Sequence, residues 1–128
     1  GSDLAKNNPE LAETAEKIPE IWGDYAAEVA KQFDNKWAVL LQFDTLLPQY
    51  WDQLQALFKH VQSPEYFAGL FARTGAPFTL DAFRLTVEEF RLAALNARAI
   101  RERITVLDLA AHAGVLEAAT EDTLQLLS

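Results

Sequence analysis

Helix-forming residues run through nearly the whole chain, and little in the sequence interrupts them. Alanine, leucine, glutamate and glutamine dominate, while glycine occurs at 5 of the 128 positions. No two segments are joined by the turn residues of a β-hairpin. The pattern predicts an all-α chain, a multi-helix bundle of about six or seven helices. The length favours a single domain, which we assign to residues 3–128.

Prolines and small polar residues mark the predicted helix starts of the first half. Asn8-Pro9-Glu10 combines a capping side chain, a proline for the first turn and an acid near the helix dipole. Pro19 is predicted to open a helix that runs to Phe33, with a break at Asp34-Asn35. Pro48 is predicted to open the next helix, near Gln49–Val61.

The second half carries clearer helix boundaries. Ser63-Pro64-Glu65 opens a short helix that Gly75 ends, and residues 75–85 are expected to form a loop. Thr86 and Glu89 have the spacing of a capping box. The helix that they open is predicted to reach about Glu102, with one apolar face formed by Val87, Phe90, Ala94, Ala97, Ile100 and Ile104.

Two shorter helices are predicted at the C-terminal end. Thr105 and Asp108 repeat the three-residue spacing of a cap and its partner, which predicts a helix to Ala113. Gly114 ends this helix, and Leu116–Leu127 is predicted to form the last one.

The composition narrows the cellular setting. The chain has no cysteine, and its apolar runs are too short for a membrane span or a signal peptide. We therefore expect a cytoplasmic protein without membrane association. Gly1-Ser2 resembles the scar that remains after an expression tag is cleaved, and it is left out of the fold.

The net charge of −8 disfavours nucleic acid as a partner, because an acidic protein repels the phosphate backbone. The charge is uneven along the chain. Residues 1–34 carry −5 and residues 104–128 carry −4, whereas residues 35–80 are neutral.

The sequence lacks the patterns of the common catalytic and cofactor sites. No glycine-rich turn suits a dinucleotide. His60 and His112 are far apart, and neither has a second metal ligand one helical turn away. The pairs of neighbouring acids have the spacing of solvated helix faces. We therefore predict no catalytic, cofactor-binding or metal-binding residue in this chain.

Four arginines lie close together in the sequence and form a candidate binding site, for which two interpretations remain open. Arg91 and Arg98 are seven residues apart and are predicted to share a helix face, with Arg101 and Arg103 close behind. Such donors would suit a phosphate-bearing substrate. The simpler interpretation, which we favour, is a set of salt bridges to the acidic helices.

Aromatic residues gather in the first half of the chain. Most are expected to be core residues, because aromatics at helical spacing usually are. A surplus could instead form a docking surface. The eight residues are Trp22, Tyr25, Phe33, Trp37, Phe43, Tyr50, Trp51 and Phe58.

Three motifs of the C-terminal half carry a resemblance to a known family. They are G-A-P at Gly75–Pro77, L-T-V-E-E-F at Leu85–Phe90 and I-R-E-R-I-T-V-L-D-L at Ile100–Leu109. Together they resemble the C-terminal part of glycerol-1-phosphate dehydrogenases, in the iron-dependent alcohol dehydrogenase superfamily. The match is best over Gly75–Leu116 and weaker over residues 24–36 and 51–58. The family usually has an aromatic residue where this chain has Ile104.

The resemblance implies a parent enzyme whose catalytic parts lie elsewhere. In the superfamily an N-terminal α/β domain binds NAD(P), and a helical domain holds a divalent metal through an aspartate and histidines. The last histidine lies in a His-Gly motif, which this chain lacks, so no residue here inherits a ligand role. The metal and NAD(P) are implied for the parent enzyme, and none is expected in this chain.

Two accounts of function follow. In the first, the chain is the C-terminal helical subdomain of such an oxidoreductase, inactive alone, and its partner is the rest of the parent enzyme or a second copy. In the second, it is a stand-alone helical protein–protein interaction module. Either account predicts self-association, because a helical layer without its neighbours exposes an apolar face.

Overall fold

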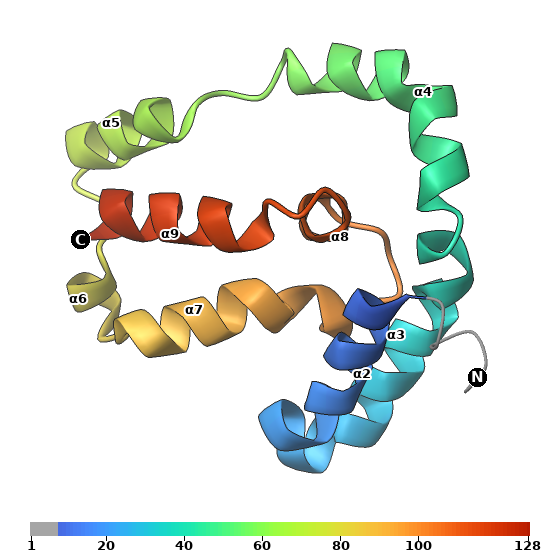
Figure 1. The fold of residues 1–128 in the computed structure, drawn as a ribbon. Coiled ribbons are helices and arrows are strands. Elements are labelled where there is room, and N and C mark those ends of the chain that lie inside the picture. Colours follow the sequence, from blue (N-terminus) through green and yellow to red (C-terminus); the bar gives the residue numbers. More distant parts are fainter. Residues whose placement is uncertain (1–7) are drawn as a thin grey trace.

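The computed structural model describes residues 8–128, and Gly1-Ser2 lies outside this range. The described part of the chain is all-α and contains no strand, which confirms the predicted fold class. Figure 1 shows the arrangement. In chain order the elements are α2 (Pro9–Trp22), the 3₁₀ turn η1 (Gly23–Tyr25), α3 (Ala26–Leu40), α4 (Phe43–Phe58), α5 (Pro64–Thr74), α6 (Leu80–Phe83), α7 (Val87–Asn96), the 3₁₀ turn η2 (Ala97–Ile100), α8 (Val106–His112) and α9 (Leu116–Leu127).

Helices α2 and α3 pack against each other and build the core. Their facing side chains repeat at three- and four-residue spacing, so each helix buries one stripe. The 3₁₀ turn η2 packs on α3 and adds Ala99 to this core. The buried core residues are Leu11, Ile18, Val29, Phe33, Leu40, Phe43 and Ala99.

Two predicted boundaries in this region are wrong. Pro19 lies inside α2, which continues to Trp22 and ends where Gly23 adopts a positive φ of 48°. Asp34 and Asn35 lie in the middle of α3 and do not break it. Their side chains are exposed between the buried Phe33 and Lys36, so packing of the opposite face outweighs their weak helix propensity.

Helix α4 begins earlier than predicted, at Phe43, and Pro48 lies within it. A proline inside a helix removes one backbone hydrogen bond. Phe43 is buried against the core, and Leu47 packs on the same cluster. These contacts hold the turn before Pro48 in the helix.

The caps of the second half agree with the sequence. The Ser63 hydroxyl accepts from the Tyr66 N–H at 3.1 Å, and Gly75 ends α5 with a left-handed φ of 71°. Thr86 and Glu89 form the predicted capping box: the Thr86 N–H donates to Glu89 Oε2 at 2.8 Å, and Thr86 Oγ1 accepts from the Glu89 N–H at 3.1 Å. The expected loop 75–85 contains the one-turn helix α6, which Thr79 caps.

The predicted long helix to Glu102 is wrong at its end. Helix α7 stops at Asn96, and the chain continues as η2 to Ile100. The tighter 3₁₀ turn rotates the side chains that follow. It buries Arg98 and Ala99 against α2 and α3 instead of continuing the α7 face.

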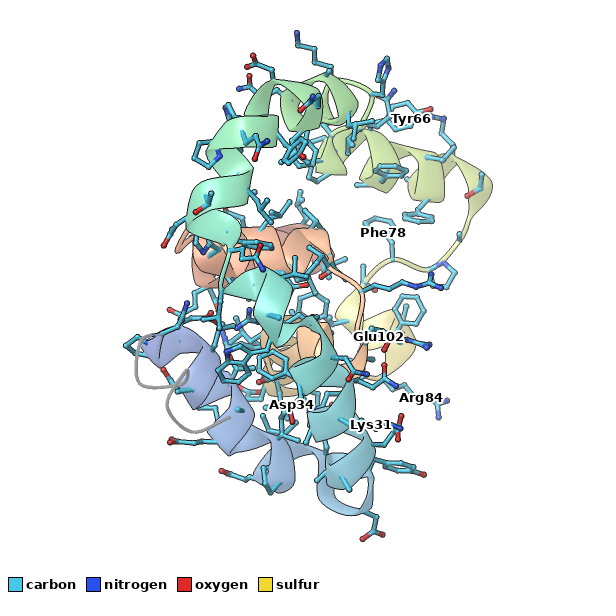
Figure 2. All side chains as sticks on the ribbon, turned by 90° about the vertical axis from the view of Figure 1, so that its right-hand side faces the viewer. Lys31, Asp34, Tyr66, Phe78, Arg84 and Glu102 are labelled. Atoms are coloured by element: carbon cyan, nitrogen blue, oxygen red, sulfur yellow. The ribbon has the colours of Figure 1, made fainter. Side chains whose placement is uncertain are left out.

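The remaining helices form a layer beside the α2–α3 pair (Figure 1). Helix α9 packs on α7 on one side and on α5 on another, and α8 contacts α9 and η2. The segment after η2 is tied to α3, because Asn35 Nδ2 donates to Glu102 Oε2 at 2.9 Å and the Glu102 N–H donates to Gln32 Oε1 at 3.2 Å. Figure 2 shows Glu102 on the same side of the molecule as Lys31 and Asp34 of α3.

Helix α4 lies along one edge and packs extensively on none of the other described elements after its first turns. The prediction that most of the eight aromatic residues belong to the core is therefore wrong for half of them. Phe33 and Phe43 are buried, and Trp22 and Trp37 are half-buried against the core cluster. Tyr25, Tyr50, Trp51 and Phe58 are exposed.

The chain exposes more surface than a compact protein of its size. Its accessible area is 9116 Å², whereas a compact monomer of this length exposes about 6800 Å². Allowing residues 1–7 the full area of an extended chain, about 1000 Å², still leaves a surplus of more than about 1000 Å². Part of this surplus is apolar, because large hydrophobic residues are exposed on α4, α5 and α7.

Candidate functional site

A lysine occupies a core position of α3. Lys36 follows Val29 and Phe33 on the buried stripe and precedes Leu40, and only 1% of its surface is exposed. A buried ammonium group is very costly unless an opposite charge and hydrogen-bond acceptors meet it. Its neighbours therefore decide whether this stripe can pack at all.

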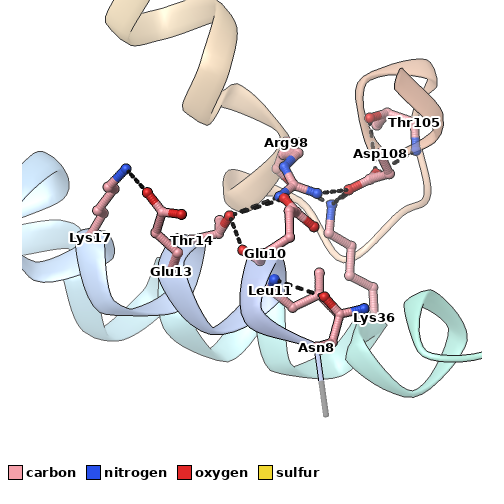
Figure 3. Close-up of polar contacts among 10 residues, drawn as sticks. All are labelled: Asn8, Glu10, Leu11, Glu13, Thr14, Lys17, Lys36, Arg98, Thr105 and Asp108. Atoms are coloured by element: carbon pink, nitrogen blue, oxygen red, sulfur yellow. Dashed lines mark hydrogen bonds and ion pairs between the residues drawn. The ribbon is translucent and has the colours of Figure 1, made fainter. Parts of the chain in front are cut away.

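Asp108 supplies the opposite charge. This residue lies in the first turn of α8 and is as buried as Lys36. The Lys36 Nζ donates to Asp108 Oδ1 at 2.9 Å and to Oδ2 at 3.0 Å. Asp108 Oδ2 also accepts from the Thr105 N–H at 2.8 Å and from Thr105 Oγ1 at 3.0 Å (Figure 3). The carboxylate that caps α8 thus also holds the buried lysine.

Arg98 completes the cluster from η2. Its guanidinium donates to Glu10 and, at 2.8 Å, to Thr14 Oγ1, both on α2. A second nitrogen lies 3.7 Å from Asp108 Oδ1, and the Arg98 carbonyl accepts from Lys36 Nζ. Burial lowers the pKa of Arg98, and the nearby Asp108 carboxylate opposes that shift. An arginine remains charged under these conditions.

Four elements meet at the cluster of Glu10, Lys36, Arg98 and Asp108 (Figure 3), in which Glu10 is exposed and the other three side chains are buried. The cavity beside it, lined in part by Arg98, Asp108 and His112, has a volume of about 10 Å³. That is room for one water molecule and no substrate. The arrangement can fix α2, α3, η2 and α8 relative to one another.

The four arginines singled out in the sequence do not converge. Arg91 points to α9, where its Nε donates to Glu121 Oε1 at 2.6 Å and its NH2 donates to Oε2 at 3.1 Å. This ion pair raises the pKa of Arg91 and lowers the pKa of Glu121. The hydrogen bond between the two side chains is the largest cause of both shifts. Arg98 faces α2 and α8 instead, so the predicted shared face is wrong. Arg101 and Arg103 are exposed, and neither forms an ion pair within residues 8–128.

Two hollows lie along the groove between α2 and α7. Their volumes are about 370 Å³ and 360 Å³, and they share Lys17, Leu95 and Asn96. Several charged groups at the rim already have partners, since Lys17 bonds Glu13 at 2.6 Å and Arg98 bonds Glu10. The Lys17–Glu13 bond raises the pKa of Lys17 and lowers that of Glu13. These four charged groups of the groove are thus engaged within the molecule.

The two histidines lie apart. His112 Nε2 is 3.2 Å from Asp44 Oδ1, and its ring packs edge-on against Phe43. His60 is exposed in the turn after α4. Across residues 8–128, no three His, Asp or Glu side chains come close enough together to hold a metal ion. None of the helices in this range is long and apolar enough to cross a membrane.

The sequence does not predict the cluster around Lys36, although it predicts a separate role for two of its residues. Asp108 is predicted only to cap a helix, and Glu10 only to lie in the first turn of one. The sequence signal for this cluster is Lys36, a charged residue that lies between Phe33 and Leu40 on an otherwise apolar stripe. A charged residue on an apolar stripe predicts a buried partner, although the sequence does not say which acid provides it.

Comparison with known proteins identifies no relative. No protein family, no curated protein and no solved structure matches the chain. The resemblance of residues 75–116 to glycerol-1-phosphate dehydrogenases therefore stays a prediction.

Proposed function

We propose that this chain is a non-catalytic docking subdomain, the C-terminal helical part of a glycerol-1-phosphate dehydrogenase-like oxidoreductase that depends on NAD(P) and a metal. Its role would be to cover and brace the helices of the parent enzyme. The observation that carries the proposal is the large exposed apolar surface, with Trp51, Phe58 and Phe67 each more than 40% exposed. Soluble monomers rarely leave contiguous apolar faces of this kind uncovered.

The residues behind the family resemblance support the proposal by what they do in the fold. Gly75 of the G-A-P motif provides the left-handed end of α5. Thr86 and Glu89 of the second motif cap α7. Thr105 and Asp108 of the third motif start α8, and Asp108 pairs with Lys36. These motifs fix the ends and positions of helices. A subdomain that braces other helices of an enzyme would need such fixed helices.

The residues described do not fit the metal ion that the resemblance implies. His112 pairs with Asp44 at 3.2 Å, and residues 8–128 contain no group of three side chains placed to hold a metal ion. We therefore derive no catalytic step from this chain. Reduction of dihydroxyacetone phosphate would belong to the parent enzyme.

The proposal predicts that the isolated chain has no dehydrogenase activity. Dihydroxyacetone phosphate, NADH or NADPH and a divalent metal should give no oxidation of the nicotinamide above the protein-free blank, as measured by absorbance. Turnover proportional to the protein concentration would contradict the proposal. The coding sequence upstream of Asp3 gives an independent check, because a dinucleotide-binding fold followed by a His-Gly motif is expected there.

A second candidate function is a stand-alone helical interaction module. The specific observation in its favour is the aromatic surface on two successive helices, formed by Tyr50, Trp51 and Phe58 of α4 and by Tyr66, Phe67 and Phe71 of α5. Aromatic side chains are enriched at the centres of protein interfaces. An upstream sequence with an unrelated domain, or a start codon, would favour this candidate over the first.

A further inference from the structure

The apolar side chains of α4 form one stripe that the described fold leaves largely uncovered. We call Leu47, Tyr50, Trp51, Leu54, Leu57 and Phe58 the α4 stripe. Their three- and four-residue spacing places them on one face of the helix. Leu47 reaches the core cluster, whereas Tyr50, Trp51, Leu57 and Phe58 are 42–65% exposed. The stripe is thus anchored at one end and open along most of its length.

The charges of α4 distinguish between the ways in which another helix could cover the stripe. Asp44 lies in the first turn, Asp52 lies in the middle, and Lys59 follows the last residue. Two parallel copies would place Asp44 beside Asp44 and Lys59 beside Lys59. Two antiparallel copies would instead keep these like charges at opposite ends of the pair, and their helix dipoles would oppose.

We infer that the α4 stripe is a homodimer interface, in which α4 packs antiparallel on α4 of a second copy about a two-fold axis. This inference rests on the docking role proposed above and names the partner. Interdigitating the stripe places Leu47 beside Leu57 of the second copy and Tyr50 beside its Leu54. In this register the two copies of Asp44 lie at opposite ends of the pair, as do the two copies of Lys59.

Area and charge both suit a second copy. The surplus surface of the whole chain, more than about 1000 Å², exceeds the roughly 800 Å² that each partner buries in a standard interface, and the exposed side chains of α4 contribute to it together with those of α5 and α7. The net charge of −8 would repel two copies, but residues 43–74 carry only −1. Two copies that meet through α4 and α5 therefore bring little of the negative charge of the chain together.

Sedimentation velocity over a range of concentrations tests the interface with a matched pair of variants. Leu54→Glu places a charge at the centre of the stripe, and Gln49→Glu places the same charge on the opposite face of α4. The wild type and Gln49→Glu should sediment as dimers, whereas Leu54→Glu should weaken dimerisation by about tenfold or more. A wild-type monomer at hundreds of micromolar, or equal behaviour of the two variants, would overturn the inference.

Cysteine cross-linking tests the orientation, because the natural chain contains no cysteine. An equimolar mixture of Leu47→Cys and Leu57→Cys should oxidise mainly to the mixed disulfide. In the antiparallel arrangement two copies of the same variant hold their cysteines about 15 Å apart, too far to bond. Predominance of the two like-with-like disulfides would instead show a parallel pair and contradict the inference.

The two proposals fail separately. A chain that stays monomeric and yet follows a dinucleotide-binding domain in its coding sequence would refute the homodimer and keep the docking subdomain. A dimer that depends on Leu54, found in a chain with no such domain upstream, would support the α4 interface and refute the dehydrogenase parent. Circular dichroism of Leu54→Glu guards against misfolding, since its helical content should equal that of Gln49→Glu.

Discussion

Asp108 is the counter-charge for two buried cations, Lys36 and Arg98. The effect of a substitution in the cluster therefore depends on which of the three residues is changed. The Asp108 carboxylate bonds Lys36 directly and lies 3.7 Å from a guanidinium nitrogen of Arg98. Removing one partner of a buried pair leaves a charge without compensation in a medium of low polarity. The three side chains are therefore not equivalent, and Asp108 is the one that the other two share.

Asp108→Asn should lower the free energy of unfolding by about 3–5 kcal/mol, because Lys36 and Arg98 then remain buried without a counter-charge. Lys36→Met should cost less, because Asp108 keeps Thr105 and the nearby Arg98. Urea unfolding followed by tryptophan fluorescence measures both. In the double variant the two losses should fall well short of adding, as expected for residues in one network. Strict additivity would show that the pair is not coupled.

At this scale the sequence predicts residue types better than partners. The Asn8, Ser63 and Thr86 caps were predictable because each acts on a backbone group three residues away. The Lys36–Asp108 pair spans 72 positions, and helix periodicity alone does not select Asp108 from the other acids of the chain. Arg98 was singled out for its charge, but its burial depends on η2, which the sequence did not reveal.

Helices α5, α6 and α7 each begin at a side-chain cap that can be removed singly. The Glu89 carboxylate accepts from the Thr86 N–H and from the Thr86 hydroxyl, and these two bonds lower the pKa of Glu89. A carboxylate whose pKa is lowered by folding stabilises the native state once it is ionised. That stabilisation is present above the ordinary carboxyl pKa and is lost as the pH falls through the lower, folded pKa.

Thr86→Ala should destabilise the chain by about 1 kcal/mol, because the first turn of α7 loses its cap. Glu89→Gln should lower stability at neutral pH and flatten the acidic part of the stability profile. Chemical denaturation at a series of pH values between neutrality and strong acid measures the effect. Glu88→Gln is the matched control, because its side chain lies outside the capping box, and it should preserve the acid dependence that Glu89 contributes. An equally steep profile for Glu89→Gln would contradict this account.

Helix boundaries were predictable where a local bond sets them and not where packing does. Leu116–Leu127 was predicted with its observed limits, and Gly114, with φ at 71°, separates it from α8. The sequence predicts helix starts at Pro19 and Pro48 and a break at Asp34-Asn35, yet all of these residues lie inside helices. Around Pro19 and Asp34-Asn35 a packed apolar face continues past the weak residue, and before Pro48 the contacts of Phe43 and Leu47 hold the first turn of α4. The end of α7 failed in the opposite sense, because contacts of Arg98 and Ala99 favour a 3₁₀ turn.

The whole molecule divides into a packed part and an open part. Helices α2 and α3, joined by η2 and α8, contain most of the buried core and the ion-pair cluster. Helix α4 beyond its first turns has few packing contacts and an exposed apolar stripe. Segments with few buried contacts open at low free energy, whereas the core opens only with global unfolding.

Amide hydrogen exchange should therefore separate the two parts. At low protein concentration, amides of residues 50–58 should exchange much faster than those of residues 29–37. Raising the concentration should slow exchange in α4 selectively, because dimerisation covers the stripe, and it should leave α3 unchanged. In Leu54→Glu the α4 amides should stay fast at every concentration. Equal protection of α3 and α4 in dilute solution would show that the division is wrong.

The distance along the chain between Lys36 and Asp108 also has a consequence for synthesis. The α2–α3 hairpin, which contains Lys36, is synthesised first, and Asp108 is added 72 residues after Lys36. At 5–20 residues per second that interval lasts about 4–14 s. Until then the nascent hairpin carries a charged group on the face that it must bury. The last third of the chain thus determines when the first third becomes committed to its native state, and a nascent chain that stalls before Asp108 would leave the hairpin uncommitted.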